Sequence, residues 1–143
     1  MMQEITTASP AETEELGEKI GRTLHGGEVL ALFGGMGMGK TAFARGLARG
    51  LGVTGEVSSP TFALVHEYTG TLTMYHFDMY RVTGWDDLYS TGFFDYLDAG
   101  GVLLVEWSEN IENALPENTA RIWIRRGSGE NERIFTFERN MLP

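Results

Sequence analysis

The sequence predicts an α/β fold, with a mixed central sheet of parallel core strands, flanking helices and antiparallel hairpins. The first observation is an apolar run at residues 28–33, which lacks polar alternation and therefore suits a parallel strand buried on both faces. A glycine-rich loop and an amphipathic helix follow this run directly. A second apolar run at residues 101–105 has the same character. The 143 residues suffice for one core, so a single domain over residues 1–143 is expected.

The first predicted helix begins near Ser9. The sequence Ser9-Pro10-Ala11-Glu12 matches a capping box with proline in the first helical position. Apolar residues then recur at helical spacing, at Leu16, Ile20 and Leu24. The pair Gly26-Gly27 is expected to end this helix. The helix therefore precedes the strand at residues 28–33, which is the first strand that the sequence predicts.

The helix after the glycine-rich loop is predicted from the spacing of its small and apolar residues, at Phe43, Ala44, Leu47, Ala48 and Leu51. Gly52 is expected to close it. Residues 61–68 and 71–77 are predicted strands, joined as a hairpin through Thr69-Gly70.

The second half of the chain is predicted to add short helices and a further hairpin. One or two short helices are expected within residues 85–99, before the strand at residues 101–105. A helical turn is expected within residues 109–115. Residues 120–126 and 133–138 alternate in polarity, so they are predicted to form a closing hairpin.

Composition and charge limit the function classes. The net charge is -9 and the only lysines are Lys19 and Lys40, so direct binding to nucleic acid is disfavoured and any role beside RNA is expected to use a partner. The absence of cysteine excludes disulfides and thiolate metal sites. No apolar stretch has the roughly 18 residues that cross a bilayer, and the N-terminus lacks the basic start of a signal peptide. A cytoplasmic protein without a membrane partner is expected.

The glycine-rich loop matches a phosphate-binding pattern. Residues 34–41 read Gly-Gly-Met-Gly-Met-Gly-Lys-Thr, which fits the P-loop pattern G-x-x-x-x-G-K-S/T. Such a loop directs backbone N–H groups at phosphates, and the following helix presents its positive end to them. Lys40 is expected to reach the β- and γ-phosphates of ATP and Thr41 to ligate Mg²⁺. The predicted nucleotide-binding residues are Gly35, Met36, Gly37, Met38, Gly39, Lys40, Thr41 and Ala42.

Two carboxylates near predicted strand ends are candidates for the metal ion or the attacking water. Glu106 follows the apolar strand at residues 101–105, where P-loop proteins carry an acidic residue. Asp78 follows the strand at residues 71–77 and is expected near the γ-phosphate. Lys40, Asp78 and Glu106 are the predicted catalytic residues, and Thr41, Asp78 and Glu106 the predicted metal ligands. Arg81 would contact phosphate or pair with a carboxylate. His76 is either a packed strand residue or a catalyst, and a lone histidine on a strand is more often the former.

Other polar and aromatic residues allow more than one interpretation. Thr61 lies in the segment Ser58-Ser59-Pro60-Thr61-Phe62, which would be either a switch loop that touches the γ-phosphate or a plain turn before a strand. Trp107 would stack on the nucleotide base, face a partner or fill the core. Trp85 and Trp123 are predicted to be core residues, as are the side chains of Phe93, Phe94, Tyr96 and Leu97.

Taken in order, four blocks resemble the TsaE family of bacterial P-loop ATPases, which are required for the threonylcarbamoyladenosine modification of tRNA. The blocks are residues 34–41, Ser59-Pro60-Thr61-Phe62, His76-Phe77-Asp78-Met79-Tyr80-Arg81 and Glu106-Trp107. The resemblance covers nearly the whole chain. The last three blocks are far more specific than a P-loop alone.

The resemblance implies roles for individual residues and for partners. Lys40 and Thr41 would serve phosphate and Mg²⁺, Glu106 would help to hold the metal, and Asp78 would act near the γ-phosphate. Thr61 would lie in a switch-like loop and Trp107 near the nucleotide. The partners would be TsaB- and TsaD-like proteins, with tRNA contacted mainly through them, and ATP hydrolysis would support turnover of the assembly.

Two other functions are compatible with a P-loop. A stand-alone kinase or phosphotransferase would need an arginine-rich lid, yet Arg121, Arg125 and Arg126 fall on the terminal hairpin. A GTPase-like switch would carry an Asn-Lys-x-Asp base reader, and neither lysine of this chain lies in that context.

For the ATPase that the four blocks indicate, slow ATP hydrolysis by the isolated chain is expected, with a higher rate when partners bind.

Overall fold

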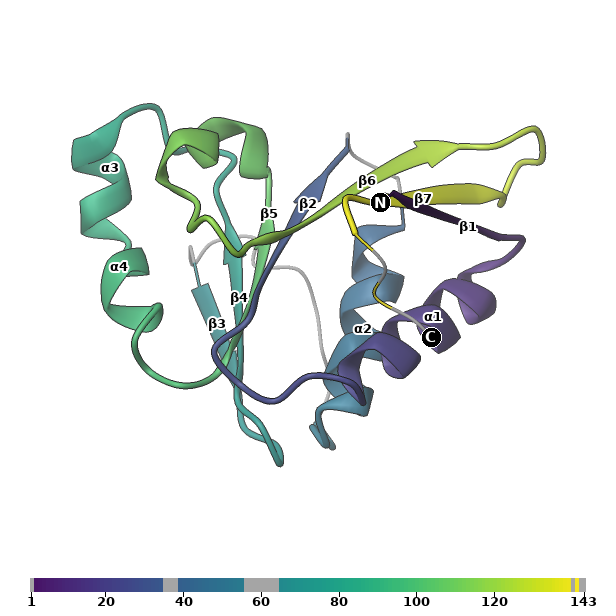
Figure 1. Ribbon diagram of the computed structural model, residues 1–143, viewed down its shortest axis with the longest axis horizontal. Coiled ribbons are helices and arrows are strands. Elements are labelled where there is room, and N and C mark those ends of the chain that lie inside the picture. Colours follow the sequence, from purple (N-terminus) through teal and green to yellow (C-terminus); the bar gives the residue numbers. More distant parts are fainter. Residues whose placement is uncertain (1, 35–38, 56–64, 140, 142–143) are drawn as a thin grey trace.

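Seven strands of the computed structural model form one sheet in the order β1-β7-β6-β2-β5-β4-β3 (Figure 1). The structure describes residues 2–34, 39–55, 65–139 and 141. Along the chain the elements are β1 (Gln3–Thr7), α1 (Pro10–Gly21), β2 (Val29–Phe33), α2 (Lys40–Gly50), β3 (Val65–Tyr68), β4 (Met74–Asp78), α3 (Trp85–Ser90), α4 (Phe93–Tyr96), β5 (Val102–Glu106), the 3-10 helix η1 (Ser108–Ala114), β6 (Ala120–Arg126) and β7 (Arg133–Phe137).

The predicted mixed sheet is confirmed. Strands β6, β2, β5 and β4 form a parallel core, with Ala31 paired to both Val105 and Arg121. The edges are antiparallel, with β3 against β4 on one side and β1 against β7 against β6 on the other. All five residues of β2 and of β5 are buried, as expected for strands covered on both faces.

Helices cover both faces of the sheet (Figure 1). Helices α1 and α2 pack on one face, where Phe43, Leu47 and Ile20 meet strand residues such as Leu30 and Leu104. On the opposite face Leu88 of α3, Phe93 of α4 and Ile111 of η1 pack against strand residues that include Ala31, Phe77 and Val105. Successive strand residues alternate between these two clusters, because side chains of a strand point to opposite faces in turn.

Helices α1 and α2 approach each other closely because glycines occupy their contact. A Cβ atom added at Gly46 would lie 1.9 Å from the carbonyl oxygen of Glu14, and one added at Gly17 would lie 2.5 Å from the carbonyl oxygen of Phe43. At the exposed margin, Arg49 forms ion pairs with Glu14 at 3.1 Å and with Glu18 at 2.9 Å. The close contact fixes the position of α2, whose first residue is Lys40.

The helix starts and hairpins agree with the predictions, with differences at element ends. The Ser9 hydroxyl accepts from the Glu12 N–H at 3.2 Å, as in the predicted capping box, whereas the Glu12 carboxylate accepts at 2.9 Å from the N–H of Ala8, one residue before the N-cap. Helix α1 ends at Gly21, not at Gly26. Gly26 and Gly27 instead adopt φ angles of 105° and 88° in the turn that leads into β2.

The sequence prediction missed one strand and misplaced one tryptophan. Strand β1 precedes α1, so the strand at residues 28–33 is not the first. Trp85 is 54% exposed, so its prediction as a core residue is wrong. Trp123 is half-buried and stacks on Phe33 with ring centroids 5.4 Å apart. Among the described residues no helix has the length and apolar character needed to cross a membrane.

Candidate functional site

The carboxyl ends of β2, β5 and β4 lie side by side, and chemically active residues gather there. Gly34 follows β2, Glu106 ends β5 and Asp78 ends β4, where it is paired in register with Glu106. Ligands of open α/β sheets bind at this edge.

The polar side chains on these strands share the sheet face that α2 covers. Alternation along β4 places His76 and Asp78 on the same face as Met74, and Glu106 lies on the same face of β5 as Leu104. Met74 and Leu104 belong to the core cluster that includes residues of α1 and α2. The three polar side chains therefore lie on the side of the sheet where α2 begins with Lys40.

The start of α2 has features that favour the binding of an anion. Gly39 is its N-cap, with a φ angle of 85° that glycine adopts without steric cost, and no side chain caps the helix. The first hydrogen bond of the helix runs from the Phe43 N–H to the Gly39 carbonyl at 3.1 Å. The preceding backbone N–H groups therefore belong to the first turn, where an α-helix binds phosphate through its amides and its positive dipole.

Lys40 occupies the centre of the site. It is only 6% exposed, and its Nζ atom donates to the Gly34 carbonyl at 3.1 Å. The same Nζ atom lies 3.8 Å from Oε1 of Glu106 and 4.8 Å from the ring centroid of Trp107. A buried ammonium needs such partners because its transfer out of water is costly. A phosphate oxygen would offer the same ammonium a charged acceptor.

Glu106 has both carboxylate oxygens engaged. Oε2 lies 2.6 Å from Nε2 of His76, and Oε1 faces the Lys40 ammonium. Glu106 is 6% exposed and His76 is fully buried, so neither group is oriented by solvent. The Nδ1 atom of His76 has no hydrogen-bond partner among the described residues. The short contact through Nε2 therefore sets the orientation of the Glu106 carboxylate.

Asp78 is held in a turn at the end of β4. Its Oδ1 atom accepts from the Tyr80 N–H at 2.9 Å, and its side chain is half-buried. The adjacent Met79 N–H donates to the Glu106 carbonyl at 3.0 Å. Asn110 tightens the same loop, because its Nδ2 atom donates to the carbonyls of Met79 at 2.8 Å and Tyr80 at 3.2 Å. The backbone that carries Asp78 is thus tied to β5 and to η1.

Trp107 has an unusual backbone conformation directly after Glu106. Its φ angle of 58° makes it the only residue other than glycine with positive φ in the described part of the chain. For a bulky side chain this conformation costs about 1–2 kcal/mol. In this conformation the half-buried indole of Trp107 contacts the Lys40 ammonium and the Tyr80 ring. The centroids of the Trp107 and Tyr80 rings lie 4.9 Å apart. Strain of this kind is concentrated at functional sites.

The structure brings together most of the predicted site residues that it describes. Gly39, Lys40, Thr41 and Ala42 lie at the start of α2, and Asp78, Glu106 and Trp107 at the facing strand ends. Arg81 lies on the exposed loop after β4, and no ion pair or side-chain hydrogen bond of its guanidinium occurs within the described ranges. Gly35, Met36, Gly37, Met38 and Thr61, with the segment 58–62, lie outside the described residues.

Sequence reasoning underestimated His76 and did not single out Asn110. The signal for His76 was its position two residues before Asp78 on one strand, which puts both side chains on one face. Its partner Glu106 is 30 residues away, so local pattern does not reveal the contact. Asn110 acts through backbone carbonyls on another loop, and no sequence signal marks such a residue.

The donor set at the site suits a magnesium ion held together with phosphate. A hydroxyl on Thr41 and carboxylates on Asp78 and Glu106 are the oxygen donors that Mg²⁺ prefers. Among the described residues no group of three or more His, Cys, Asp or Glu side chains is arranged to hold a metal alone. Mg²⁺ usually binds through one or two carboxylates together with phosphate oxygens and water.

A buried parallel strand, a glycine-rich loop and a helix that begins with a buried lysine define a P-loop NTPase-like protein. The model of the family described as threonylcarbamoyl adenosine biosynthesis protein TsaE matches residues 7–135. The chain belongs to the TsaE family.

Individual relatives agree with this assignment. The chain is 42% identical over 132 residues to the tRNA threonylcarbamoyladenosine biosynthesis protein TsaE of Bacillus subtilis, which covers 92% of this chain and 82% of the relative. It is 40% identical to the TsaE protein of Treponema pallidum, over 88% of this chain and 93% of the relative. The crystal structure of Bacillus subtilis YdiB superposes with a TM-score of 0.80 at 38% identity, covering 96% of this chain and 84% of that structure.

Proposed function

We propose that this chain, acting as one domain over residues 1–143, binds and hydrolyses ATP with Mg²⁺ in support of threonylcarbamoyladenosine synthesis on tRNA. The observation that carries the proposal is the position of the Lys40 ammonium, between the Gly34 carbonyl and the Glu106 carboxylate at the start of α2. Membership of the TsaE family and the names of its relatives support the biological role.

The proposed nucleotide contacts follow from the chemistry of each group. Backbone amides at Gly39, Lys40, Thr41 and Ala42, together with those of the loop residues 35–38, would bind phosphate oxygens. The Lys40 ammonium would exchange its Gly34 carbonyl for a phosphate oxygen, which is a stronger charge-assisted partner. Thr41, Asp78 and Glu106 would hold Mg²⁺, which when bound neutralises charge on the β- and γ-phosphates.

Asp78 and Glu106 would differ in role. Both oxygens of Glu106 already contact His76 and Lys40, whereas Asp78 is less buried and its hydrogen bond from the Tyr80 N–H uses Oδ1. We propose that Asp78 orients the attacking water or the metal beside the γ-phosphate, and that Glu106 acts on the metal once Lys40 has moved to phosphate. Trp107 and Thr61 are proposed to lie near the nucleotide, and Arg81 to pair with phosphate or carboxylate only in a rearranged loop.

Slow hydrolysis by the isolated chain is proposed because no arginine is poised at the described site. Arg133 lies near Gly39, with its Cγ atom 3.8 Å from the place where a Cβ atom of Gly39 would stand. Its Nη1 atom, however, donates to the carbonyls of Glu130 at 3.0 Å and Glu132 at 2.9 Å. In some P-loop proteins a partner supplies the arginine that stabilises the transition state.

Partners are proposed to be TsaB- and TsaD-like proteins, with tRNA contacted mainly through them. A net charge of -9 disfavours direct binding to the phosphate backbone of RNA. A small-molecule kinase is the alternative, and transfer of the γ-phosphate to a small acceptor in the absence of both partners would favour it. A switch that works by binding alone would show nucleotide-dependent capture of partners without turnover.

Substitution of Lys40 tests the proposal directly. Lys40→Ala is expected to abolish binding in a calorimetric titration with ATP and Mg²⁺ while circular dichroism shows a retained fold. Lys19→Ala, which removes the chain's only other lysine from an exposed position on α1, is the matched control and is expected to bind as the wild type does. Equal ATP affinity of the wild type and Lys40→Ala would refute the site.

Turnover assays test the role of partners. The wild-type chain is expected to release inorganic phosphate from ATP slowly alone and faster when both partner proteins are present. A high rate that is indifferent to the partners would contradict the proposed function, even if the nucleotide site itself were correct.

A further inference from the structure

Helices α3 and α4 expose aromatic rings that the nucleotide site does not use. Trp85 is 54% exposed and Tyr89 is 64% exposed, whereas Phe94 is half-buried between them and the core. The ring centroids of Trp85 and Phe94 are 6.4 Å apart with nearly parallel planes, and those of Tyr89 and Phe94 are 5.1 Å apart. We call these three residues the aromatic surface. Large rings held together and open to solvent commonly mark a binding surface.

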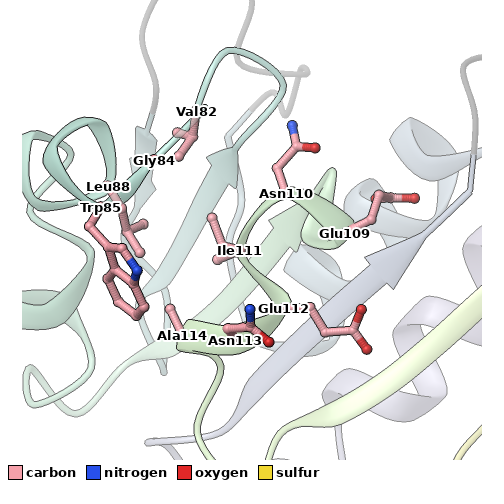
Figure 2. A pocket seen from close by; sticks show the side chains of 10 residues that line it. All are labelled: Val82, Gly84, Trp85, Leu88, Glu109, Asn110, Ile111, Glu112, Asn113 and Ala114. Atoms are coloured by element: carbon pink, nitrogen blue, oxygen red, sulfur yellow. The ribbon is translucent and has the colours of Figure 1, made fainter.

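A hollow adjoins the aromatic surface, between α3 and η1 (Figure 2). Its volume is about 230 Å³. Apolar side chains of the lining are Val82, Trp85, Leu88, Ile111 and Ala114, and polar ones are Glu109, Asn110, Glu112 and Asn113. Figure 2 shows Glu109 and Glu112 on the far side of Ile111 from Trp85, so the hollow has an aromatic wall and an acidic rim. An apolar side chain of moderate size would fit against the wall formed by Trp85, Leu88 and Ile111, with polar groups of its segment at the rim.

The chain segment that forms this surface, between Arg81 and Arg121, has charges of one sign. Residues 82–120 contain no lysine or arginine. Their acidic residues, all exposed except Glu106, are Asp86, Asp87, Asp95, Asp98, Glu106, Glu109, Glu112 and Glu117. This stretch carries nearly all of the chain's net charge of -9. A partner that is complementary to it must be basic.

We propose that the aromatic surface and the adjoining hollow dock a basic segment of a partner protein, with an arginine on the exposed rings and an apolar side chain in the hollow. An arginine side chain stacks on Trp and Tyr rings and pairs with nearby carboxylates such as that of Asp86. Acidic RNA would be repelled by the same carboxylates. A second copy of this chain that docked through the same surface would place one acidic surface against another. The inference rests on the proposed function for its choice of partners, and it concerns a surface outside the nucleotide site.

The experiment measures binding of the chain to the TsaB- and TsaD-like proteins of the same organism, by calorimetry or biolayer interferometry with ATP present. Trp85→Ala and Asp86→Lys are the test variants, and both alter exposed side chains. Each is expected to weaken partner binding by about tenfold or more, the effect of losing a central interface contact. Glu15→Lys, at an exposed position on α1, changes the charge by the same amount as Asp86→Lys. This control variant is expected to bind the partners as the wild type does. ATP affinity is expected to stay unchanged in all three.

The outcomes separate this inference from the proposed function. If the wild type binds the partners and both test variants bind equally well, the docking surface is refuted while the proposed function stands. If the wild type binds ATP but neither partner, the inference and the partner role fail together, and the ATP site stands. A photo-crosslinker in place of Tyr89 gives a second readout. Crosslinks to a partner segment with arginine and apolar residues support the inference, and crosslinks to RNA, to a second copy or to an acidic segment overturn it.

Discussion

The Nε2 atom of His76 lies 2.6 Å from Oε2 of Glu106, and both side chains are buried on the sheet face that α2 covers. The other carboxylate oxygen lies 3.8 Å from the Lys40 ammonium. A histidine, a carboxylate and an ammonium thus form one chain of contacts from β4 through β5 to the start of α2. This relationship is the reason to predict that His76 positions Glu106, which sequence pattern alone does not support.

Replacement of His76 is expected to affect turnover more than nucleotide affinity. His76→Leu removes the partner that orients Glu106, and it leaves a buried carboxylate with one contact fewer. Loss of such a partner costs about 1–3 kcal/mol of stability. We expect a lower partner-stimulated rate, a nearly unchanged dissociation constant for ATP by calorimetry, and a lower melting temperature.

His76→Gln is the conservative control for that variant. Its side-chain amide can still donate to the Glu106 carboxylate, so partial recovery of the turnover rate is expected. If His76→Leu and His76→Gln lose the rate equally, or if neither changes it, the contact with Glu106 does not position the site.

Trp107 is expected to report nucleotide binding by fluorescence. Its indole lies 4.8 Å from the Lys40 ammonium, and this contact would change when Lys40 turns to phosphate. Addition of ATP and Mg²⁺ to the wild type should therefore alter the intrinsic emission. Trp107→Phe should lose this change, whereas Trp85→Phe, which alters an exposed tryptophan on α3, should retain it. Retention of the change by Trp107→Phe would show that another tryptophan reports binding, and an unchanged emission of the wild type would show that the ammonium stays on the Trp107 ring.

The sequence predicted the parallel core and the P-loop because both leave local signals. Burial on both faces makes β2 and β5 continuous apolar runs, and the glycine-rich pattern ends in Lys40 and Thr41 next to a helical repeat. The order of the strands brings Asp78 and Glu106 to one edge, as expected from their positions at strand ends. These features depend on a few neighbouring residues, so they can be predicted from the sequence.

The features that sequence missed depend on distant parts of the chain. Strand β1 is short and largely polar, and it exists because Gln3–Thr7 pairs with β7 near the other terminus. Trp85 is a large aromatic residue of the kind that usually fills a core. It lies instead at the start of α3, a helix of six residues, where its side chain is exposed to solvent. The contact of His76 with Glu106 joins two strands 30 residues apart.

The close packing of α1 on α2 predicts that one added methyl group at their contact lowers the free energy of unfolding. Gly46→Ala would place a Cβ atom 1.9 Å from the carbonyl oxygen of Glu14, so the two helices would have to separate. Overpacking of this kind costs about 1–3 kcal/mol of unfolding free energy. Urea unfolding should show the loss. Gly55→Ala, where a Cβ atom would meet nothing within 4 Å, should change stability little, and equal effects of the two substitutions would contradict the close helix contact.

Asp87 offers a test of local electrostatics beside the proposed docking surface. The pKa of its carboxyl lies below its ordinary value, chiefly because the Thr83 hydroxyl donates to it and also because the Thr83 N–H does. A carboxyl whose pKa is lowered by folding stabilises the fold above its unfolded-state pKa, and that contribution is lost as the pH falls through the folded-state pKa. Thr83→Val removes the hydroxyl, so the pKa of Asp87 should rise toward its ordinary value in a carbon-13 NMR titration. Thr83→Ser keeps the hydroxyl and should preserve the lowered pKa. The stability difference between Thr83→Val and Thr83→Ser should be present at neutral pH and shrink in acid, and a difference that grows in acid would contradict the assignment.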